Sequence, residues 1–287
     1  MKKWIKNVLI AAAIMAAAGL LLTGIGLIWG GIQGVENLKM SWGSEELLDL
    51  PNADDRYEVE AQGIRNLDIH WVAGEVSVSY WDGDTIVLQE DSRRDLTART
   101  RLAYEVEQDT LKVEFLQGWN WFGLTRLDGK DLQVLVPQAM AGSLEKLELD
   151  VVSAQVDLQD LTVRKLEVDT VSGSVSGTGL TAGKASFDSV TGGIQVSFLD
   201  CPNALYAESV SGRLEFTLPR DSAFTLKAKS AVGGLTTDIP ETPQADSHVD
   251  LDTISGAMVI RAGDQVEAEP ETEPTKAPDV TTGATDD

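Results

Sequence analysis

The fold of this chain is decided by the stretch LEVDTVSGSVSG, residues 166–177. Related twelve-residue phrases begin at Leu147, Ala185, Leu205, Leu226 and Val249, and a seventh copy, LDIHWVAGEVSV, begins at Leu67. From Leu147 onward the successive phrases start 19, 19, 20, 21 and 23 residues apart. A recurring period of this length is typical of a stacked-repeat architecture rather than of a compact enzyme fold.

The phrase has a fixed apolar pattern. Positions one and three are apolar, position six is usually Val or Ile, position eight is usually Gly, and position ten is nearly always apolar. Because side chains of a strand change face at every residue, this alternation predicts strands. The parity shifts between positions three and six, which predicts a bulge or corner near positions four and five. Glycine then falls on the inward side, where a corner leaves little room for a side chain.

Two architectures satisfy this pattern. We expect each repeat to supply a strand, a corner, a second strand and a return segment such as QDLTVRK, residues 159–165. Coils stacked ~4.8 Å apart with Val, Leu, Ile and Phe inside would form a parallel β-solenoid, a β-helix-like repeat domain. An antiparallel β-sandwich of repeated hairpins is the alternative. The sequence therefore predicts an all-β domain over residues 63–262, with the solenoid preferred.

Residues 79–146 have a different character. They contain the strand-like segments TIVLQE, RLAYEVEQ, TLKVEFLQ and DLQVLVPQ, and EQDT, residues 107–110, is typical of a hairpin turn. The exposed core and sheet edge at the end of a stack need cover. We expect this elaboration to cap the N-terminal end of the repeats.

The N-terminal segment predicts a membrane helix. No charged residue occurs between Asn7 and Val35, and the apolar stretch exceeds the ~20 residues that cross a bilayer. A cleavable signal peptide is the alternative, although its apolar core is usually shorter. Lysines at positions 2, 3 and 6 place residues 1–6 in the cytoplasm by the positive-inside rule. The expected protein is therefore single-pass in the cell membrane, with its C-terminal domain outside.

Two further segments flank the repeat domain. Residues 36–62 are predicted to be a linker between the membrane helix and the repeats. Residues 263–287 are acidic and rich in Pro and Thr, and they contain no large apolar side chains beyond two valines. This composition predicts a disordered tail.

Composition excludes several classes of protein. The formal net charge is −23, with 46 acidic and 23 basic residues, which argues against nucleic acid as a partner. Cys201 is the sole cysteine, so neither an intramolecular disulfide nor a cysteine metal site can form.

Position four of the phrase carries most of the candidate chemistry. It holds His70, Asp150, Asp169, Asp188, Glu208, Lys229 and Asp252, which a solenoid would stack on one outer line. Like charges at that spacing repel unless solvent or cations intervene. One hypothesis is a calcium ladder held by Asp150, Asp169, Asp188 and Glu208. The other is that these carboxylates face water and accept hydrogen bonds at the corner from amides or from the hydroxyls of Thr170, Ser189, Ser209 and Thr253. No other cofactor is predicted.

No catalytic residue is predicted. Asp169 and Asp188 on adjacent coils resemble the carboxylate arrays of β-helical polysaccharide hydrolases, but such sites need a groove and inserted loops. The repeats here are short and almost free of insertions. His70 and His248 are the two histidines of the chain, and they form no Ser/His/Asp pattern.

An aromatic segment is the other candidate site. Trp119, Trp121 and Phe122 lie within GWNWFGL, residues 118–124. Exposed aromatics of this kind favour contacts with glycans, peptides or a membrane interface. The alternative is an aromatic plug over the first coil, packed against Trp71 and Trp81.

The V-S-G phrases at residues 171–173, 190–192 (as V-T-G), 210–212 and 254–256 (as I-S-G), with their preceding strands and the N-terminal anchor, resemble a known family. It is the bacterial "putative adhesin" β-strand-repeat family, a domain of unknown function. The resemblance covers residues 67–261. It implies an exported β-repeat domain of the cell envelope, with a role in adhesion or envelope stress, and it supplies no catalytic residues.

Three functions follow in order of preference. The first is a non-enzymatic, adhesin-like scaffold that presents an interaction surface outside the membrane, with an envelope protein or cell-wall component as partner. The second is a regulatory or sensing component of an envelope-stress system. The third is an enzyme acting on cell-wall polysaccharide.

Overall fold

The computed structural model describes residues 55–93, 96, 100–115 and 129–263. The predicted membrane helix over 7–35, the aromatic segment over 118–124 and the acidic tail from residue 264 lie outside these ranges. Within the described ranges, no helix has the length and hydropathy needed to cross a bilayer.

The described residues are all-β apart from one short 3-10 helix, η2 (Gln138–Met140). The strands of the N-terminal end are β1 (Arg56–Glu60), β3 (Thr85–Ser92), β4 (Ala103–Glu107), β5 (Thr110–Glu114) and β6 (Lys130–Pro137). The repeats form β2 (Asn66–Trp81), β7 (Lys146–Gln159), β8 (Thr162–Thr170), β9 (Val175–Ser189), β10 (Ile194–Phe198), β11 (Ala204–Ser211), β12 (Leu214–Pro219), β13 (Phe224–Val232), β14 (Leu235–Thr237), β15 (Ser247–Ser255) and β16 (Met258–Gly263).

The seven phrases occupy equivalent places in the stack. Their first residues pair in one continuous register, in the spatial order Leu67, Leu147, Leu166, Ala185, Leu205, Val249 and Leu226. All of these pairings are parallel, as a solenoid requires. Antiparallel pairing is confined to β1–β3, β3–β6 and β4–β5 at the N-terminal end. The alternative of a sandwich made of antiparallel hairpins is therefore wrong.

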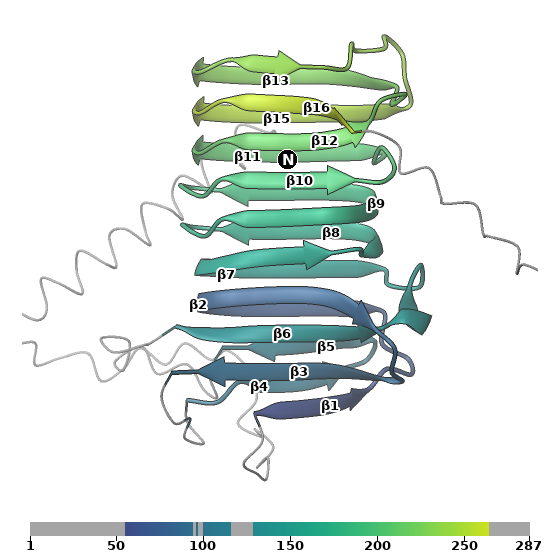
Figure 1. Ribbon diagram of the computed structural model, residues 1–287, viewed down its shortest axis with the longest axis vertical. Coiled ribbons are helices and arrows are strands. Elements are labelled where there is room, and N and C mark those ends of the chain that lie inside the picture. The colour runs from purple at the N-terminus through teal and green to yellow at the C-terminus, as the bar shows by residue number, and fades with distance from the viewer. Residues whose placement is uncertain (1–54, 94–95, 97–99, 116–128, 264–287) are drawn as a thin grey trace, which may run out of the picture. The chain divides into compact units, whose positions relative to one another are not determined.

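Each coil contributes one strand to each of two layers (Figure 1). Positions one to five of the phrases form the layer that we call face A, in the order β4-β5-β2-β7-β8-β9-β11-β15-β13. The second halves of the phrases form face B, which includes β6, β10, β12, β16 and β14. The long strands β2, β7 and β9 bend between the layers and contribute to both.

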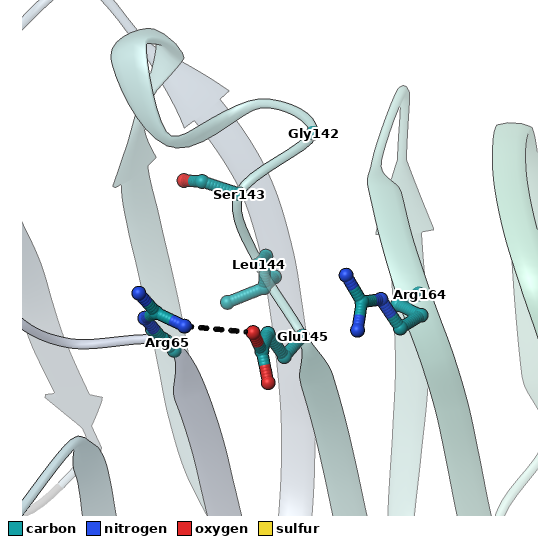
Figure 2. A pocket seen from close by; sticks show the side chains of 6 residues that line it. All are labelled: Arg65, Gly142, Ser143, Leu144, Glu145 and Arg164. Carbon is teal, nitrogen blue, oxygen red and sulfur yellow. Dashed lines mark hydrogen bonds and ion pairs between the residues drawn. The ribbon is translucent and has the colours of Figure 1, made fainter.

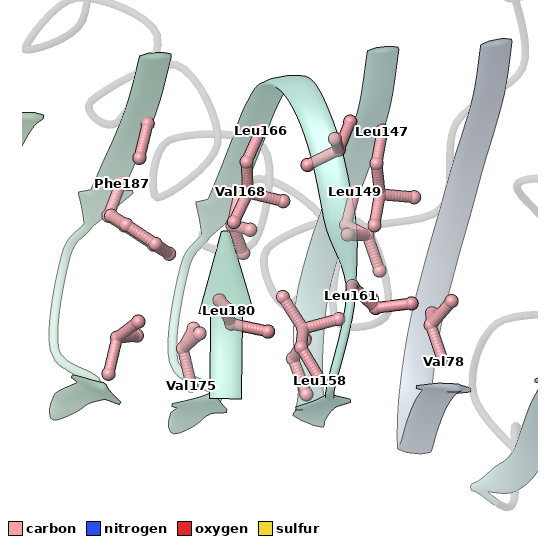
Figure 3. Close-up of a cluster of buried hydrophobic side chains, with 14 of the residues drawn as sticks. Val78, Leu147, Leu149, Leu158, Leu161, Leu166, Val168, Val175, Leu180 and Phe187 are labelled. Carbon is pink, nitrogen blue, oxygen red and sulfur yellow. The ribbon is translucent and has the colours of Figure 1, made fainter. Parts of the chain in front are cut away.

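The core lies between the two faces. Leucine, valine and phenylalanine side chains from successive coils meet there, as Figure 3 shows for Leu149, Val168 and Phe187. Phe187 of face A contacts Phe216 of face B, with ring centroids 5.6 Å apart. Because both layers are covered on their inner side by each other, apolar burial stabilises each inner coil, whereas the β13–β14 coil at the end of the stack buries less.

The corner lies two residues later than the sequence predicts. Positions one, three and five all point inward, so Thr170 and Ser189 are buried beside the apolar side chains. The backbone turns at positions six and seven, and the glycine at position eight points inward again. Each of these two hydroxyls accepts a hydrogen bond from the glycine amide three residues later, at 2.9 Å for Thr170–Gly173 and 2.9 Å for Ser189–Gly192. The position-six valine is consequently outside the core.

The last two coils exchange places relative to their order in the chain. Strands β15 and β16 lie between the β11–β12 coil and the β13–β14 coil, which takes the end of the stack. The sequence explains this order. The inserted coil buries four apolar side chains fully: Val249, Leu251, Met258 and Ile260. The terminal coil instead has Ala228 and Thr237 at inward positions, and its lysines at 227 and 229 are exposed. The least apolar coil thus occupies the position with one side in solvent.

A buried ion pair joins the elements at the N-terminal end. Lys130 donates to Glu90, to the Thr100 carbonyl at 2.7 Å and to the Phe115 carbonyl at 2.5 Å. Glu90 also accepts from the Leu102 amide at 3.0 Å. These contacts compensate the cost of burying the two charges. Strand β1 falls inside the range 36–62 that the sequence predicts to be a linker, so that range contains at least one strand of the folded body.

The corner glycines generate the first prediction. A Cβ at position 173 would lie 1.7 Å from the Ala154 carbonyl oxygen, whereas a Cβ at position 234 would meet nothing within 4 Å. We expect Gly173→Ala to lower the free energy of unfolding by about 2–4 kcal/mol through overpacking. The control Gly234→Ala should change it by less than about 0.5 kcal/mol. Urea denaturation followed by circular dichroism measures both, and equal effects would contradict the proposed corner packing.

Candidate interaction surface

The position-six side chains form an exposed apolar row, which we call the valine ridge. Its members on adjacent coils are Val72, Val152, Val171, Val190, Val210 and Ile254. Val152 and Val171 are each 43% exposed and Ile254 is 57% exposed, while the other three are half-buried. A continuous apolar row on a surface is a common mark of an interaction site. The sequence pattern located these residues but assigned them to the core.

Hydroxyl groups fix the backbone beside the ridge. Ser153 donates to the Val72 carbonyl at 3.0 Å, Ser172 to the Val152 carbonyl at 3.2 Å, and Thr191 to the Val171 carbonyl at 3.2 Å. Each bond joins position seven of one coil to position six of the preceding coil. The ridge is therefore held by side-chain bonds as well as by the β ladder, and it presents a rigid surface.

The position-four residues lie on the same face, two residues before the ridge. The register places Asp150, Asp169, Asp188 and Glu208 on consecutive coils, as the sequence predicts. The buried hydroxyls of Thr170 and Ser189 point away from this row, so they do not donate to it. In the described residues no group of three or more His, Cys, Asp or Glu side chains is arranged to hold a metal ion. The calcium ladder stays a prediction, which a calcium titration of the melting temperature would test.

Basic side chains line face A where its strands begin, at the end opposite the corner. Lys146, Lys165 and Lys184 lie on consecutive coils, immediately before position one of each phrase. Glu167 forms ion pairs with Lys146 at 3.0 Å and with Lys165 at 2.7 Å. The basic row therefore balances neighbouring glutamates, and the acidic row of position four lies between it and the valine ridge.

His70 is enclosed by three carboxylates. Its Nε2 lies 3.1 Å from Asp68 Oδ1 and 3.3 Å from Asp150 Oδ2, and its Nδ1 lies 2.9 Å from Glu114 Oε1. Hydrogen bonds to Asp150, Asp68 and Glu114 raise the pKa of His70 to about 12. An imidazole held in the protonated form has no lone pair for a metal ion or for a substrate proton. His70 therefore acts as a fixed cation at the N-terminal end of the acidic row.

A shallow hollow of about 240 Å³ lies where β2, β7 and β8 begin (Figure 2). Arg65, Glu145 and Arg164 line it, and Arg65 donates to Glu145 at 2.9 Å. The Arg65 side chain is 60% exposed, so solvent screens its charge. The hollow contains neither Asp169 nor Asp188, and these two carboxylates lie on the outer surface of face A instead.

Both tryptophans proposed to anchor an aromatic plug have partners of their own. Trp71 is buried, donates to the Lys130 carbonyl at 2.8 Å and packs edge-on against Phe115. Trp81 donates to the Thr85 carbonyl at 2.9 Å. The predicted contact residues Trp119, Trp121 and Phe122 lie outside the described residues.

The His70 cluster predicts a pH dependence of stability. The pKa of His70 in the folded state is above its unfolded value of ~6.5, so its contribution is complete below pH 6.5 and declines as the pH rises toward 12. We expect wild-type stability above pH 7 to fall more steeply than that of His70→Gln, by up to ~1.4 kcal/mol per pH unit. Because His70 is 35% exposed, solvent screens its ion pairs. The stability difference should therefore change over a smaller pH range than the interval from 6.5 to 12. Denaturation curves between pH 6 and 10 measure the free energy of unfolding of both proteins. If it changes with pH equally in both, the three carboxylates do not hold His70 in the protonated form.

The chain is similar to solved structures and to one protein family. A search of curated proteins gave no match. A "putative cell adhesion protein" from Clostridium sporogenes is 12% identical with a TM-score of 0.48, covering 74% of this chain and 99% of its own. A "putative adhesin" from Bacteroides fragilis is 15% identical with a TM-score of 0.43, covering 77% of this chain and 98% of its own.

The family model of the Toastrack DUF4097 domain matches residues 61–261. This range runs from the residue after β1 to the strand β16, so it includes all seven phrases and both faces of the stack. The chain belongs to the Toastrack DUF4097 family, a domain of unknown function.

Proposed function

We propose that this protein is a non-enzymatic component of the bacterial cell envelope that binds another envelope component through the valine ridge. Residues 7–35 anchor it in the membrane, and the β-repeat body stands outside as a rigid scaffold. The observation that supports this function is the exposed row of β-branched side chains on successive coils.

Apart from Val72, which packs partly against the core, the ridge residues are not needed to fill it. In every coil except the terminal one, the side chains at inward positions one, three, five and ten close the space between the faces, with Trp71, Val151 or a hydroxyl residue at position five. A polar residue at position six would leave those contacts intact and would avoid the cost of hydrating an apolar side chain. Valine or isoleucine nevertheless occupies this position in six of the seven phrases. A bound partner that covers the row accounts for this choice.

The acidic row indicates the chemistry of the partner. Asp150, Asp169, Asp188 and Glu208 lie two residues from the ridge, along the same direction. Complementary charge beside an apolar contact favours association and sets its orientation. The partner should therefore be a protein segment that carries an apolar stripe flanked by Lys or Arg, rather than an anionic wall polymer.

Catalysis is not part of this proposal. Asp169 and Asp188 lie side by side on the outside of a layer, and the hollow in Figure 2 does not include them. A glycoside hydrolase needs its two carboxyl groups on opposite sides of the scissile bond, in a cleft that orients the sugar. The arrangement of these residues supports binding more directly.

Substitution on the ridge separates binding from folding. We expect the double variant Val152→Ser/Val171→Ser to keep its stability within about 1 kcal/mol, because both side chains are substantially exposed. It should reduce at least fivefold the amount of a specific envelope protein that is crosslinked to the intact chain in solubilised envelopes. Leu199→Ser, which alters a side chain that is 55% exposed away from the ridge, is the matched control and should keep the crosslink. Equal recovery from all three proteins would refute the ridge as the binding site.

A further inference from the structure

Among the described residues, face A ends on two strands, β4 and β13, whose outer edges are unpaired. At one end β4 pairs with β5, and at the other end β13 pairs with β15. In the part of the chain that the structure describes, neither strand has a second neighbour. The outward backbone groups of such a strand are a template for another strand, so the two ends of the stack are potential sites of association.

The two edges carry opposite charges on the same row of side chains. Glu105 pairs in register with Lys112, Lys112 with Asp68, and this row continues coil by coil to Asp250 and Lys227. The row therefore begins with exposed Glu105 on β4 and ends with exposed Lys227 on β13. If a second copy continued the stack, Glu105 of that copy would lie beside Lys227 of the first.

The inward rows are complementary in the same register. The row of position one begins with Val106 on β4 and ends with Leu226 on β13. The Val106 side chain is on the core side of the sheet, yet it is 49% exposed because no coil of the described residues covers it. The row of position three begins with Tyr104 and ends with Ala228, both half-buried. A continued stack would cover Val106 with Leu226 and would place a large side chain against a small one.

We propose that copies of this chain associate head to tail through their stack ends, with β4 of one copy paired antiparallel to β13 of the next. The direction follows from the fold, because β4 runs antiparallel to β5 and β5 runs in the same direction as the repeat strands up to β13. Such a contact joins two different surfaces, so it generates a linear array rather than a closed dimer. Two β13 edges would bring lysines together and two β4 edges would bring glutamates together, which disfavours both symmetric alternatives. This association is independent of the partner proposed for the valine ridge.

Charge reversal on the two edges tests the proposal. The full chain in a non-ionic detergent is examined by sedimentation velocity over a range of concentrations, at low and high salt. At low salt the weight-average mass of the wild-type protein should grow at least twofold with concentration, and the growth should weaken at high salt. Glu105→Lys and Lys227→Glu should each abolish the growth. An equimolar mixture of the two variants should restore it, because every contact between unlike copies again joins Lys to Glu.

Folding of each variant is verified by its melting temperature. Glu105 is 59% exposed and lies 3.9 Å from Lys112, and Lys227 is 48% exposed and pairs with Asp250 at 2.8 Å. Each charge reversal loses one of these ion pairs, which should lower the melting temperature by only about 2–4 °C because exposed pairs contribute little. A wild-type mass that does not change with concentration would overturn the proposal. So would growth that persists in either single variant, since association through the N-terminal segment would be insensitive to these charges. Failure of the mixture to recover would equally overturn it.

Discussion

The structure depends on the contact between the corner of one coil and the corner of the next. At this point the backbone of position eight lies so close to the preceding coil that a Cβ would be 1.7 Å from a carbonyl oxygen at Gly173, 1.8 Å at Gly192 and 1.9 Å at Gly256. Glycine at this position, which only the coil with Ala154 lacks among the seven phrases, allows the coils to stack in register. That register then determines which side chains from distant parts of the chain become neighbours.

Much of the fold could be predicted because the period of the phrase reports this register directly. Leu147, Leu166 and Ala185 are equivalent in the sequence and equivalent in space. The corner was misplaced because Val171 is apolar, and pattern analysis assigns apolar residues to the core. The order of the last two coils was missed because the phrase at Leu226 matches the others in its glycine and leucine positions. Its smaller inward residues and its lysines are the signal that places it at the end.

The candidate surface was predicted in part for the same reason. Position four of the phrase gives the acidic row directly, since stacked coils align equal positions. The environment of His70 could not be predicted, because Glu114 belongs to β5, which lies outside the repeat and joins face A only through its pairing with β2. Trp119, Trp121 and Phe122 lie outside the described residues, so their predicted role stays a prediction.

The stacked arrangement also keeps the two proposed contacts apart. Side chains along a row repeat with every coil, so a partner that lies along the valine ridge and its acidic neighbours meets the same chemistry several times and gains contact area with each coil. The ends of the rows occur once per molecule and differ from each other, with Glu105 at one end and Lys227 at the other. The proposed lateral contact therefore depends on what is common to all coils, whereas the proposed axial contact depends on what is particular to the first and last strands. The residues of the ridge and the acidic row are largely distinct from those of the end strands β4 and β13. Substitutions in one of these surfaces would therefore leave the other surface and the core unchanged.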